Sequence, residues 1–257
     1  MGYHRAGFDE IVGVDNRPQK RYPFQFVQAD ALEFCASFGA GFDAIHASPP
    51  CQAYTAIRTS NPNRLNYWEE SVPMTRRALI TTGRPYVLEN VPGAPTSNAV
   101  QVCGLSVGVN VRRHRLFESN VFLWSTPCIA GHPGNWVTVV GRGFGRKSKI
   151  QRHPKKPRRD CVSVADARIA MGIDWMTGAE LSQAIPPAYC EFIGKQLIVA
   201  IEHDGARRRA YSSHSRTLDI SSSPDPETSY DLNMDVLVGN ASSGCLPPST
   251  SAVIGAS

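Results

Sequence analysis

Short apolar runs alternate with amphipathic segments along the first 124 residues of the chain. The apolar runs predict strands, and the segments between them, at residues 31–38 and 68–82, have the periodicity of helices. Pro73 falls early in the second of these segments and is expected to interrupt the helix. Strands that alternate with helices are typical of an α/β domain with a parallel, doubly wound sheet. The predicted strands cover residues 10–15, 24–30, 42–47 and 86–88.

The pattern changes after residue 124. The next stretch is rich in Gly, Pro, Arg and Lys, which predicts an insert between two parts of one domain. Helical patterns return at residues 163–171 and 190–201, and Thr177, three residues before Glu180, predicts a capping box. The last stretch is dominated by Ser, Pro and Asp, so we expect it to be largely disordered. The expected divisions are 1–124, an insert at 125–160, a return segment at 161–203 and a tail at 204–257.

Composition and charge add a compartment and a class of partner. The length of 257 residues fits one α/β domain with a smaller part. The formal net charge of the chain is +5. Nine Lys or Arg residues and no acidic residue lie between Arg142 and Arg159, and this favours a polyanionic partner. Seven scattered cysteines without a CxxC pair indicate reduced thiols in a cytoplasm-like compartment. No apolar run approaches the roughly 20 residues of a membrane span.

Four chemically active side chains stand at the ends of predicted strands. They are Asp15, Asp30, Cys51 and Glu89. Ligands of open α/β sheets bind at the carboxyl ends of the strands, so these residues are expected to converge on one rim. The sequence therefore predicts an active site there.

The loop Ser48-Pro49-Pro50-Cys51-Gln52 is the most specific candidate within that site. Each proline fixes its own φ and pushes the preceding residue out of the helical region, so we expect Cys51 on an extended, rigid backbone. A thiol held in this way can attack an electron-poor ring, and the Glu89 carboxyl in a second loop can protonate that ring. The alternative is a tight turn around a buried, inert cysteine.

Read in order, these segments resemble the motifs of the DNA (cytosine-5) methyltransferases, most closely the compact phage versions. The Pro-Pro-Cys-Gln loop resembles the nucleophile motif of that family, and Leu88-Glu89-Asn90-Val91 its Glu-Asn-Val motif. The segment 113–117 is similar to the Gln-x-Arg-x-Arg motif, with Val111 where the glutamine is expected. Segments around Ala170-Met171-Gly172 and Ile185-Pro186-Pro187 resemble the last two motifs. The resemblance covers residues 1 to 203.

The resemblance implies a fold and a mechanism. The fold would be a Rossmann-like, class I S-adenosylmethionine-dependent methyltransferase sheet with a small target-recognition insert. Cys51 would add as a thiolate to C6 of a cytosine flipped out of double-stranded DNA, and protonated Glu89 would hydrogen-bond N3. Arg115 would contact O2 of the base, and Arg113 would orient the pocket or a phosphate. The alternative for the two arginines is a solvated surface pair.

The resemblance also implies binding residues. Asp15 and Asp30 match acidic positions that meet the ribose and adenine of S-adenosylmethionine. The expected cofactor-binding set is Asp15, Asn16, Asp30, Ala31 and Pro49.

The basic insert would contain the target-recognition region, where arginines could read guanine edges or hold phosphates. We expect DNA contacts from Gln52, Arg142, Arg146 and Lys147, whereas the alternative is a solvated loop. Cys128, His132, His153 and Cys161 could also be arranged as a zinc site, but their spacing matches no standard pattern and no metal is expected. We expect a monomer in the cytoplasm, that of a host cell if the protein is phage-encoded.

One family motif is missing. The Gly-rich loop that cradles the methionine end of the cofactor has no counterpart, because residues 1–8 resemble the helix that follows it. We expect that the true start of the protein lies upstream of Met1, and the alternative is a truncated protein. In either case, we expect the chain as it stands to bind S-adenosylmethionine poorly. Two other functions stay open: a non-catalytic DNA-binding remnant, and a cysteine-nucleophile enzyme such as a hydrolase with His46 as its base.

Overall fold

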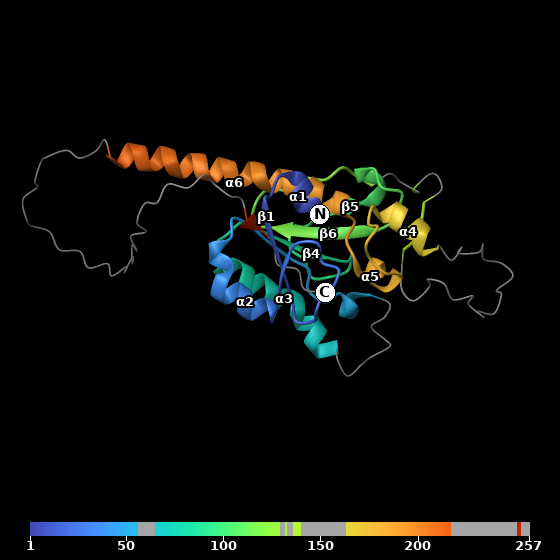
Figure 1. Cartoon of the computed structure of the whole chain (residues 1–257). Coiled ribbons are helices and arrows are strands. Elements are labelled where there is room, and N and C mark those ends of the chain that lie inside the picture. The colour runs from blue at the N-terminus through green and yellow to red at the C-terminus, as the bar shows by residue number, and fades with distance from the viewer. Residues whose placement is uncertain (56–64, 129–131, 133–135, 140–162, 217–250, 253–257) are drawn as a thin grey trace, which may run out of the picture.

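The computed structural model describes residues 1–55, 65–128, 132, 136–139, 163–216 and 251–252. Strands and helices alternate through its first half, as the sequence predicts (Figure 1). The strands are β1 (Glu10–Asp15), β2 (Gln25–Gln28), β3 (Ile45–Ala47), β4 (Tyr86–Asn90), β5 (Val100–Cys103), β6 (His114–Ser119) and β7 (Ser251–Ala252). The helices are α1 (Gly2–Ala6), α2 (Ala31–Phe38), α3 (Leu65–Thr81), α4 (Val164–Met171), α5 (Gly178–Gln183) and α6 (Pro187–Arg216).

Within the described residues, the strands form two sheets. One has the order β2-β1-β7 with parallel pairs, and the other has the order β3-β4-β6-β5. In the second sheet β3 and β4 are parallel, whereas β6 is antiparallel to both of its neighbours. Ten residues, 104–113, join β5 to β6, and a parallel pair would need a longer crossover. The α/β class is therefore confirmed, and the predicted strands pair in parallel as β1–β2 and β3–β4, but the expected parallel sheet is wrong for β5 and β6, whose pairs are antiparallel.

Helices cover the strands on two sides. In Figure 1, α2 and α3 lie below the strands, whereas α1 and α6 lie together above them. Every residue of β3 and of β4 is buried, which is the pattern of central parallel strands covered on both faces. One apolar core packs α1 and α6 against the strands, and a second packs α2 and α3 against them. The candidate site lies at the ends of the strands that these cores hold.

Helix α3 runs through Pro73 without a break, contrary to the prediction from sequence. Proline has no N–H to donate to the carbonyl four residues earlier, which here belongs to Glu69. The hydroxyl of Tyr54 donates a hydrogen bond to that carbonyl oxygen at 2.8 Å. Because a side chain from a neighbouring turn satisfies the carbonyl, the helix continues across the proline.

The expected capping box at the start of α5 is confirmed. The Thr177 side chain accepts a hydrogen bond from the Glu180 backbone N–H, and the Glu180 side chain accepts from the Thr177 N–H. Glu180 also forms a bidentate ion pair with Arg21, with N–O distances of 3.0 and 2.8 Å. A strong local signal, [ST]-x-x-E, gave the correct helix start.

The tail from residue 204, which was expected to be largely disordered, contains two described pieces of regular structure. Helix α6 continues to Arg216, and Ser251 and Ala252 form β7, which pairs in parallel with Glu10 and Ile11 of β1. Residues 217–250 and 253–257 lie outside the described part of the chain. In the described part, no helix is both long enough and apolar enough to cross a membrane.

Candidate active site

Two adjoining pockets open where β1, β3 and β4 end. The larger is a cleft of about 570 Å³, and the smaller has a volume of about 110 Å³. Asp15, Pro49 and Pro50 line both pockets, so the wall between them is the end of β1 and the loop after β3. Cys51 and Glu89 line the cleft, and Asp30 lines the smaller pocket. The expected convergence of these residues on one rim is therefore seen.

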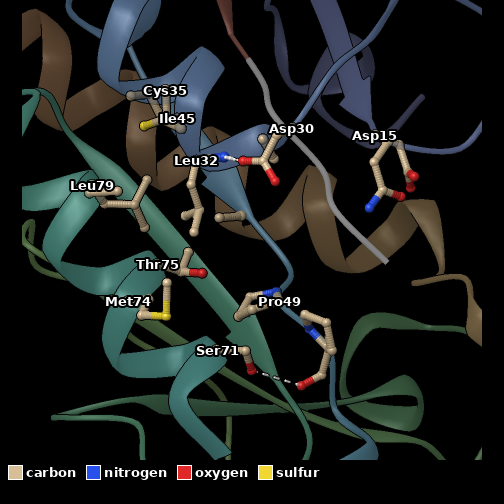
Figure 2. Close-up of a pocket in the computed structure, with 15 residues that line it drawn as sticks. Asp15, Asp30, Leu32, Cys35, Ile45, Pro49, Ser71, Met74, Thr75 and Leu79 are labelled. Atoms are coloured by element: carbon tan, nitrogen blue, oxygen red, sulfur yellow. Dashed lines mark hydrogen bonds between the residues drawn. The ribbon is translucent and has the colours of Figure 1, made fainter. Parts of the chain in front are cut away.

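The smaller pocket is mostly apolar with two carboxylates at its rim (Figure 2). Asp15 is buried, and its two oxygens accept hydrogen bonds from the Arg17 N–H at 2.8 Å and Gln19 Nε2 at 3.2 Å. Oδ1 of Asp30 caps α2 by accepting from two backbone N–H groups. All five residues of the expected cofactor-binding set are among those lining this pocket: Asp15, Asn16, Asp30, Ala31 and Pro49. Their binding of a cofactor stays a prediction.

The loop that carries Cys51 is held from two sides. Nδ2 of Asn90 donates to the Pro49 carbonyl oxygen at 3.0 Å, and Oγ of Ser71 donates to the Pro50 carbonyl oxygen at 3.2 Å. Cys51 has φ −94° and ψ 0°, just before the short 3-10 turn Gln52–Tyr54. The expected extended backbone at Cys51 is therefore wrong, because a proline restricts the residue before it and Cys51 follows Pro50. This bridge region of φ/ψ space is where many active-site residues lie.

Glu89, the fourth residue of β4, is 5% exposed and faces the cleft. Burial raises the pKa of its carboxyl, while the charges of Arg115 and Arg113 and a hydrogen bond with Ser48 act in the opposite direction. The Nε atom of Arg115 lies 2.8 Å from Oε1 of Glu89. Among the described residues, Oε1 accepts no well-aligned hydrogen bond. Oε1 is therefore buried beside Arg115, and burial favours the protonated form of the carboxyl.

Cys51 is half-buried in the same cleft. Burial raises the pKa of its thiol, the charge of Arg115 lowers it, and the charge of Glu89 raises it. The thiol is thus mostly protonated at neutral pH in the protein alone. Its ionisation depends on the two charged neighbours, which act in opposite senses.

A buried chain of polar side chains extends behind Glu89. The Tyr3 hydroxyl is 2.6 Å from Nδ1 of His46, and Nε2 of His46 is 3.0 Å from the Ser48 hydroxyl. Burial lowers the pKa of His46 to about 4, so its ring is neutral. Both ring nitrogens are engaged within this chain, which does not support His46 as a base for Cys51. The sequence analysis gave no role to Tyr3 or Ser48. The two-residue spacing of His46 and Ser48 was a usable signal, because such residues point to the same face of an extended segment.

The two arginines of the predicted motif have different surroundings. Arg115 lines the cleft beside Glu89, whereas Arg113, 7% exposed, lines neither pocket. Arg113 donates to the backbone carbonyls of Val139 and Ser182, each at 2.9 Å, and burial lowers its pKa to about 10. The alternative of a solvated surface pair is wrong. Arg113 joins segments around the cleft, which fits an orienting role better than a phosphate contact.

The expected DNA contacts are described only in part. Gln52 lines the cleft, and its buried Oε1 has no hydrogen-bond partner among the described residues. Arg142, Arg146 and Lys147 lie outside the described residues, as do His153 and Cys161. The role of the basic insert therefore stays a prediction.

Comparisons with known proteins add one structural similarity. No family model and no curated protein matches the chain. One solved structure that resembles it is a candidate DNA modification methyltransferase encoded within a prophage of E. coli. The match has a TM-score of 0.46 and 15% sequence identity, and it covers 79% of this chain and 95% of that chain. A similarity at this level does not by itself assign a fold or an activity to the present chain.

Proposed function

We propose that this protein is a DNA (cytosine-5-)-methyltransferase, which transfers a methyl group from S-adenosylmethionine to C5 of a cytosine flipped out of double-stranded DNA. The observation that carries the proposal is the meeting of Cys51, Glu89 and Arg115 in one cleft. The cleft adjoins a second, mostly apolar pocket with two carboxylates at its rim. A thiol and a carboxyl with a raised pKa are the pair that activation of a cytosine ring requires.

The residues of the cleft would activate C5 in two steps. The thiolate of Cys51 adds to C6, and the electron pair of the C5–C6 double bond moves toward C5. Protonated Glu89 donates a hydrogen bond to N3 and so stabilises the charge that develops on the ring. After methyl transfer a base removes the C5 proton, and the C6–S bond breaks to return the thiolate. Arg115, beside both groups, favours the thiolate of Cys51 and would contact O2 of the base.

The smaller pocket fits the adenosine part of S-adenosylmethionine. Its apolar side chains, among them Leu32, Ile45 and Leu79, can cover the faces of a purine. The carboxylates of Asp15 and Asp30 can accept hydrogen bonds from ribose hydroxyls and an exocyclic amine. When bound, the cofactor would supply an electrophilic methyl group.

DNA is the proposed substrate because the chemistry requires cytosine and the insert is basic. Cytosine within a duplex is out of reach of a side chain, so the base must be flipped into the cleft. Arg142, Arg146 and Lys147 of the insert are proposed to hold phosphates or read guanines, with Gln52 beside the flipped base. The protein is proposed to act as a monomer in the cytoplasm.

The proposal is tested by release of tritium from DNA that carries tritium at C5 of cytosine. Addition of Cys51 to C6 lets C5 take up a solvent proton and then lose tritium, a reaction that needs no cofactor. We expect release by the wild-type protein and none by Cys51→Ser. Cys190 lines the same cleft, and burial raises its pKa to about 12, so Cys190→Ser is the matched control and should keep the activity.

A second function would give a different result. A non-catalytic DNA-binding remnant would bind duplex DNA but release no tritium, and it would transfer no methyl group when S-adenosylmethionine is added. Release that persists in Cys51→Ser would contradict the nucleophile assignment.

A further inference from the structure

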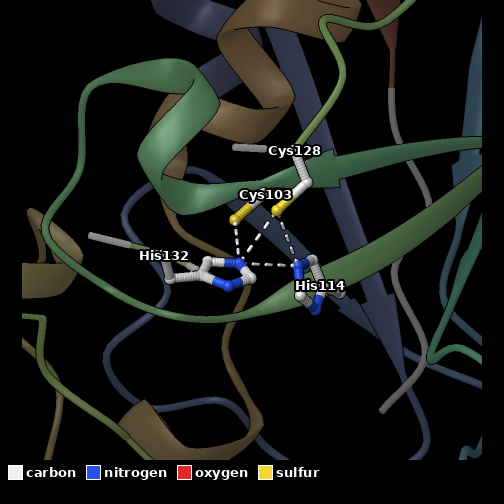
Figure 3. A group of neighbouring side chains, drawn as sticks. All are labelled: Cys103, His114, Cys128 and His132. Carbon is white, nitrogen blue, oxygen red and sulfur yellow. Dashed lines mark hydrogen bonds between the residues drawn. The ribbon is translucent and has the colours of Figure 1, made fainter. Parts of the chain in front are cut away.

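Four potential metal ligands meet beside β5 and β6 (Figure 3). They are Cys103 at the end of β5, His114 at the start of β6, and Cys128 and His132 from the segment that follows. One nitrogen or sulfur atom from each residue lies within 4.8 Å of those of the other three. Neither cysteine is in a disulfide. The proposed methyltransferase chemistry uses none of these residues.

The contacts converge on one ring nitrogen. Nε2 of His132 lies 2.9 Å from Sγ of Cys128, 3.0 Å from Nε2 of His114 and 3.4 Å from Sγ of Cys103. A further contact of 3.3 Å joins Nε2 of His114 to Sγ of Cys128. A ring nitrogen has one proton or one lone pair in its plane, so it makes one good hydrogen bond and not three. Hydrogen bonding alone therefore does not account for the convergence, whereas a cation among the four atoms does.

Main-chain structure holds the ligands in two pairs. Cys103 and His114 are directly opposite each other in the antiparallel ladder between β5 and β6. Residues directly opposite have Cβ atoms about 5 Å apart, close enough for both to reach one ion. Cys128 and His132 are four residues apart, and His132 has a positive φ of 47°. A non-glycine residue in this region is uncommon, and histidine is among the types enriched there.

We propose that Cys103, His114, Cys128 and His132 bind one Zn²⁺ ion in a tetrahedral site. Two thiolates and two imidazoles are a standard structural zinc ligand set. Ideal bonds of about 2.3 Å to sulfur and about 2.1 Å to nitrogen give ligand–ligand separations of about 3.3 to 3.8 Å. The four observed contacts, between 2.9 and 3.4 Å, are shorter than these separations by about 0.2 to 0.7 Å, so the group has to open to accommodate the ion. All four positions are taken by protein, which makes the site structural rather than catalytic.

The ion would fasten the beginning of the basic insert to the wall of the cleft. At Trp136 and Val137 the chain lies against the residues just before β6. Trp136 Nε1 donates to the His132 carbonyl oxygen at 2.9 Å, and Arg112 lies over the Trp136 ring at 4.9 Å from its centroid. Val137 then forms a bridge with Val111. His114 stands between Arg113 and Arg115 in the sequence. The metal would thus fix Cys128, His132 and residues 136–139 against the strand that carries Arg115.

The test uses the untagged full-length chain, purified without added metal or chelator. Elemental analysis is expected to find about one zinc per chain. Exchange for Co²⁺ should give the visible absorption of tetrahedral cobalt together with thiolate-to-cobalt charge transfer. Cys128→Ser and His132→Gln should lose most of the bound metal. Cys51→Ser and His4→Gln, which change the same residue types outside the cluster, should keep it.

Two results would overturn the proposal. One is wild-type protein that contains no zinc and gives no tetrahedral cobalt spectrum, with Cys103 and Cys128 found as reactive thiols or as a disulfide. The other is full metal content in both cluster variants. The cobalt spectrum is measured on wild-type protein, so a variant that fails to fold does not decide the outcome. Metal content is independent of methyl transfer, so this proposal and the proposed function can fail separately.

Discussion

The amide of Asn90 donates a hydrogen bond to the carbonyl oxygen of Pro49 at 3.0 Å and thereby joins the end of β4 to the loop after β3. Its Oδ1 accepts the N–H of Val91 at 2.9 Å, which fixes the orientation of the amide. Glu89 precedes Asn90, and Cys51 follows Pro49 by two residues. One buried amide therefore sets the relative position of the two proposed catalytic groups.

Replacement of Asn90 by Asp should misplace the Cys51 loop. The carboxylate would face the Pro49 carbonyl with no proton to donate, at a cost of about 1–3 kcal/mol in the free energy of unfolding. Tritium release should fall by more than the loss of folded protein explains. Asn120→Asp is the control, because Asn120 also bonds the backbone of β4, at Tyr86, but lies away from the cleft. Equal activities of the two variants, after correction for folded fraction, would argue against this role of Asn90.

The two charged neighbours of Cys51 should change its reactivity in opposite directions. Arg115 lowers the pKa of the thiol and Glu89 raises it. At a pH above the folded-state pKa of Glu89, where its carboxyl is ionised, Arg115→Gln should slow alkylation of Cys51 by iodoacetamide and Glu89→Gln should speed it, each by about three- to tenfold. Mass spectrometry of the Cys51 peptide measures the rates. Both variants should nevertheless lose tritium release, and a change of alkylation in the same direction in both would be inconsistent with this electrostatic account.

Glu89 should make the protein less stable as the pH rises. Burial raises its folded-state pKa above the ordinary value of 4.5, so between the two values the folded state binds more protons than the unfolded state. The contribution of this group to the free energy of unfolding is complete below about pH 4.5 and is lost as the pH rises through the folded-state pKa. Glu89→Gln lacks the titrating group, so its stability should fall less over that range. Urea unfolding of both proteins at several pH values measures the difference, and parallel curves would contradict the shift.

Removal of β7 should destabilise the protein. Deletion of residues 251–257 takes away the partner of Glu10 and Ile11, which we expect to cost about 1–3 kcal/mol for roughly two lost backbone hydrogen bonds. Deletion of residues 253–257 is the matched control, because it shortens the chain but leaves Ser251 and Ala252 in place. Thermal unfolding compares the two, and identical midpoints would show that the β7 pairing contributes nothing.

The parts of the site that follow from local rules could be predicted from the sequence. The apolar run before Pro49 and the run that contains Leu88 are strands, and parallel strands bring their ends together. Cys51 and Glu89 therefore meet in one cleft. The hydrogen bonds by which Asn90 and Ser71 hold the Cys51 loop could not be predicted, because they join segments that are far apart in the sequence.

Features that depend on long-range pairing could not be predicted in the same way. Cys103 and His114 are brought together by the register of β5 against β6, whereas the sequence analysis grouped Cys128 and His132 with His153 and Cys161 and expected no metal. The two-residue strand β7 pairs with a strand about 240 residues away and has no periodicity of its own. The continuation of α6 beyond residue 201 could have been predicted, because the Ala-Arg-Arg-Arg-Ala run at 206–210 consists of good helix formers.

The most direct test of the account is covalent trapping on duplex DNA that contains 5-fluorocytosine, with S-adenosylmethionine present. Fluorine at C5 cannot be removed as a proton, so the enzyme should remain bound through the C6–S bond after methyl transfer. The account predicts a denaturation-resistant complex in which the modified peptide carries the nucleotide on Cys51, and no complex with Cys51→Ser. Methyl transfer to ordinary DNA without such a complex, or an adduct on another cysteine such as Cys190, would contradict it.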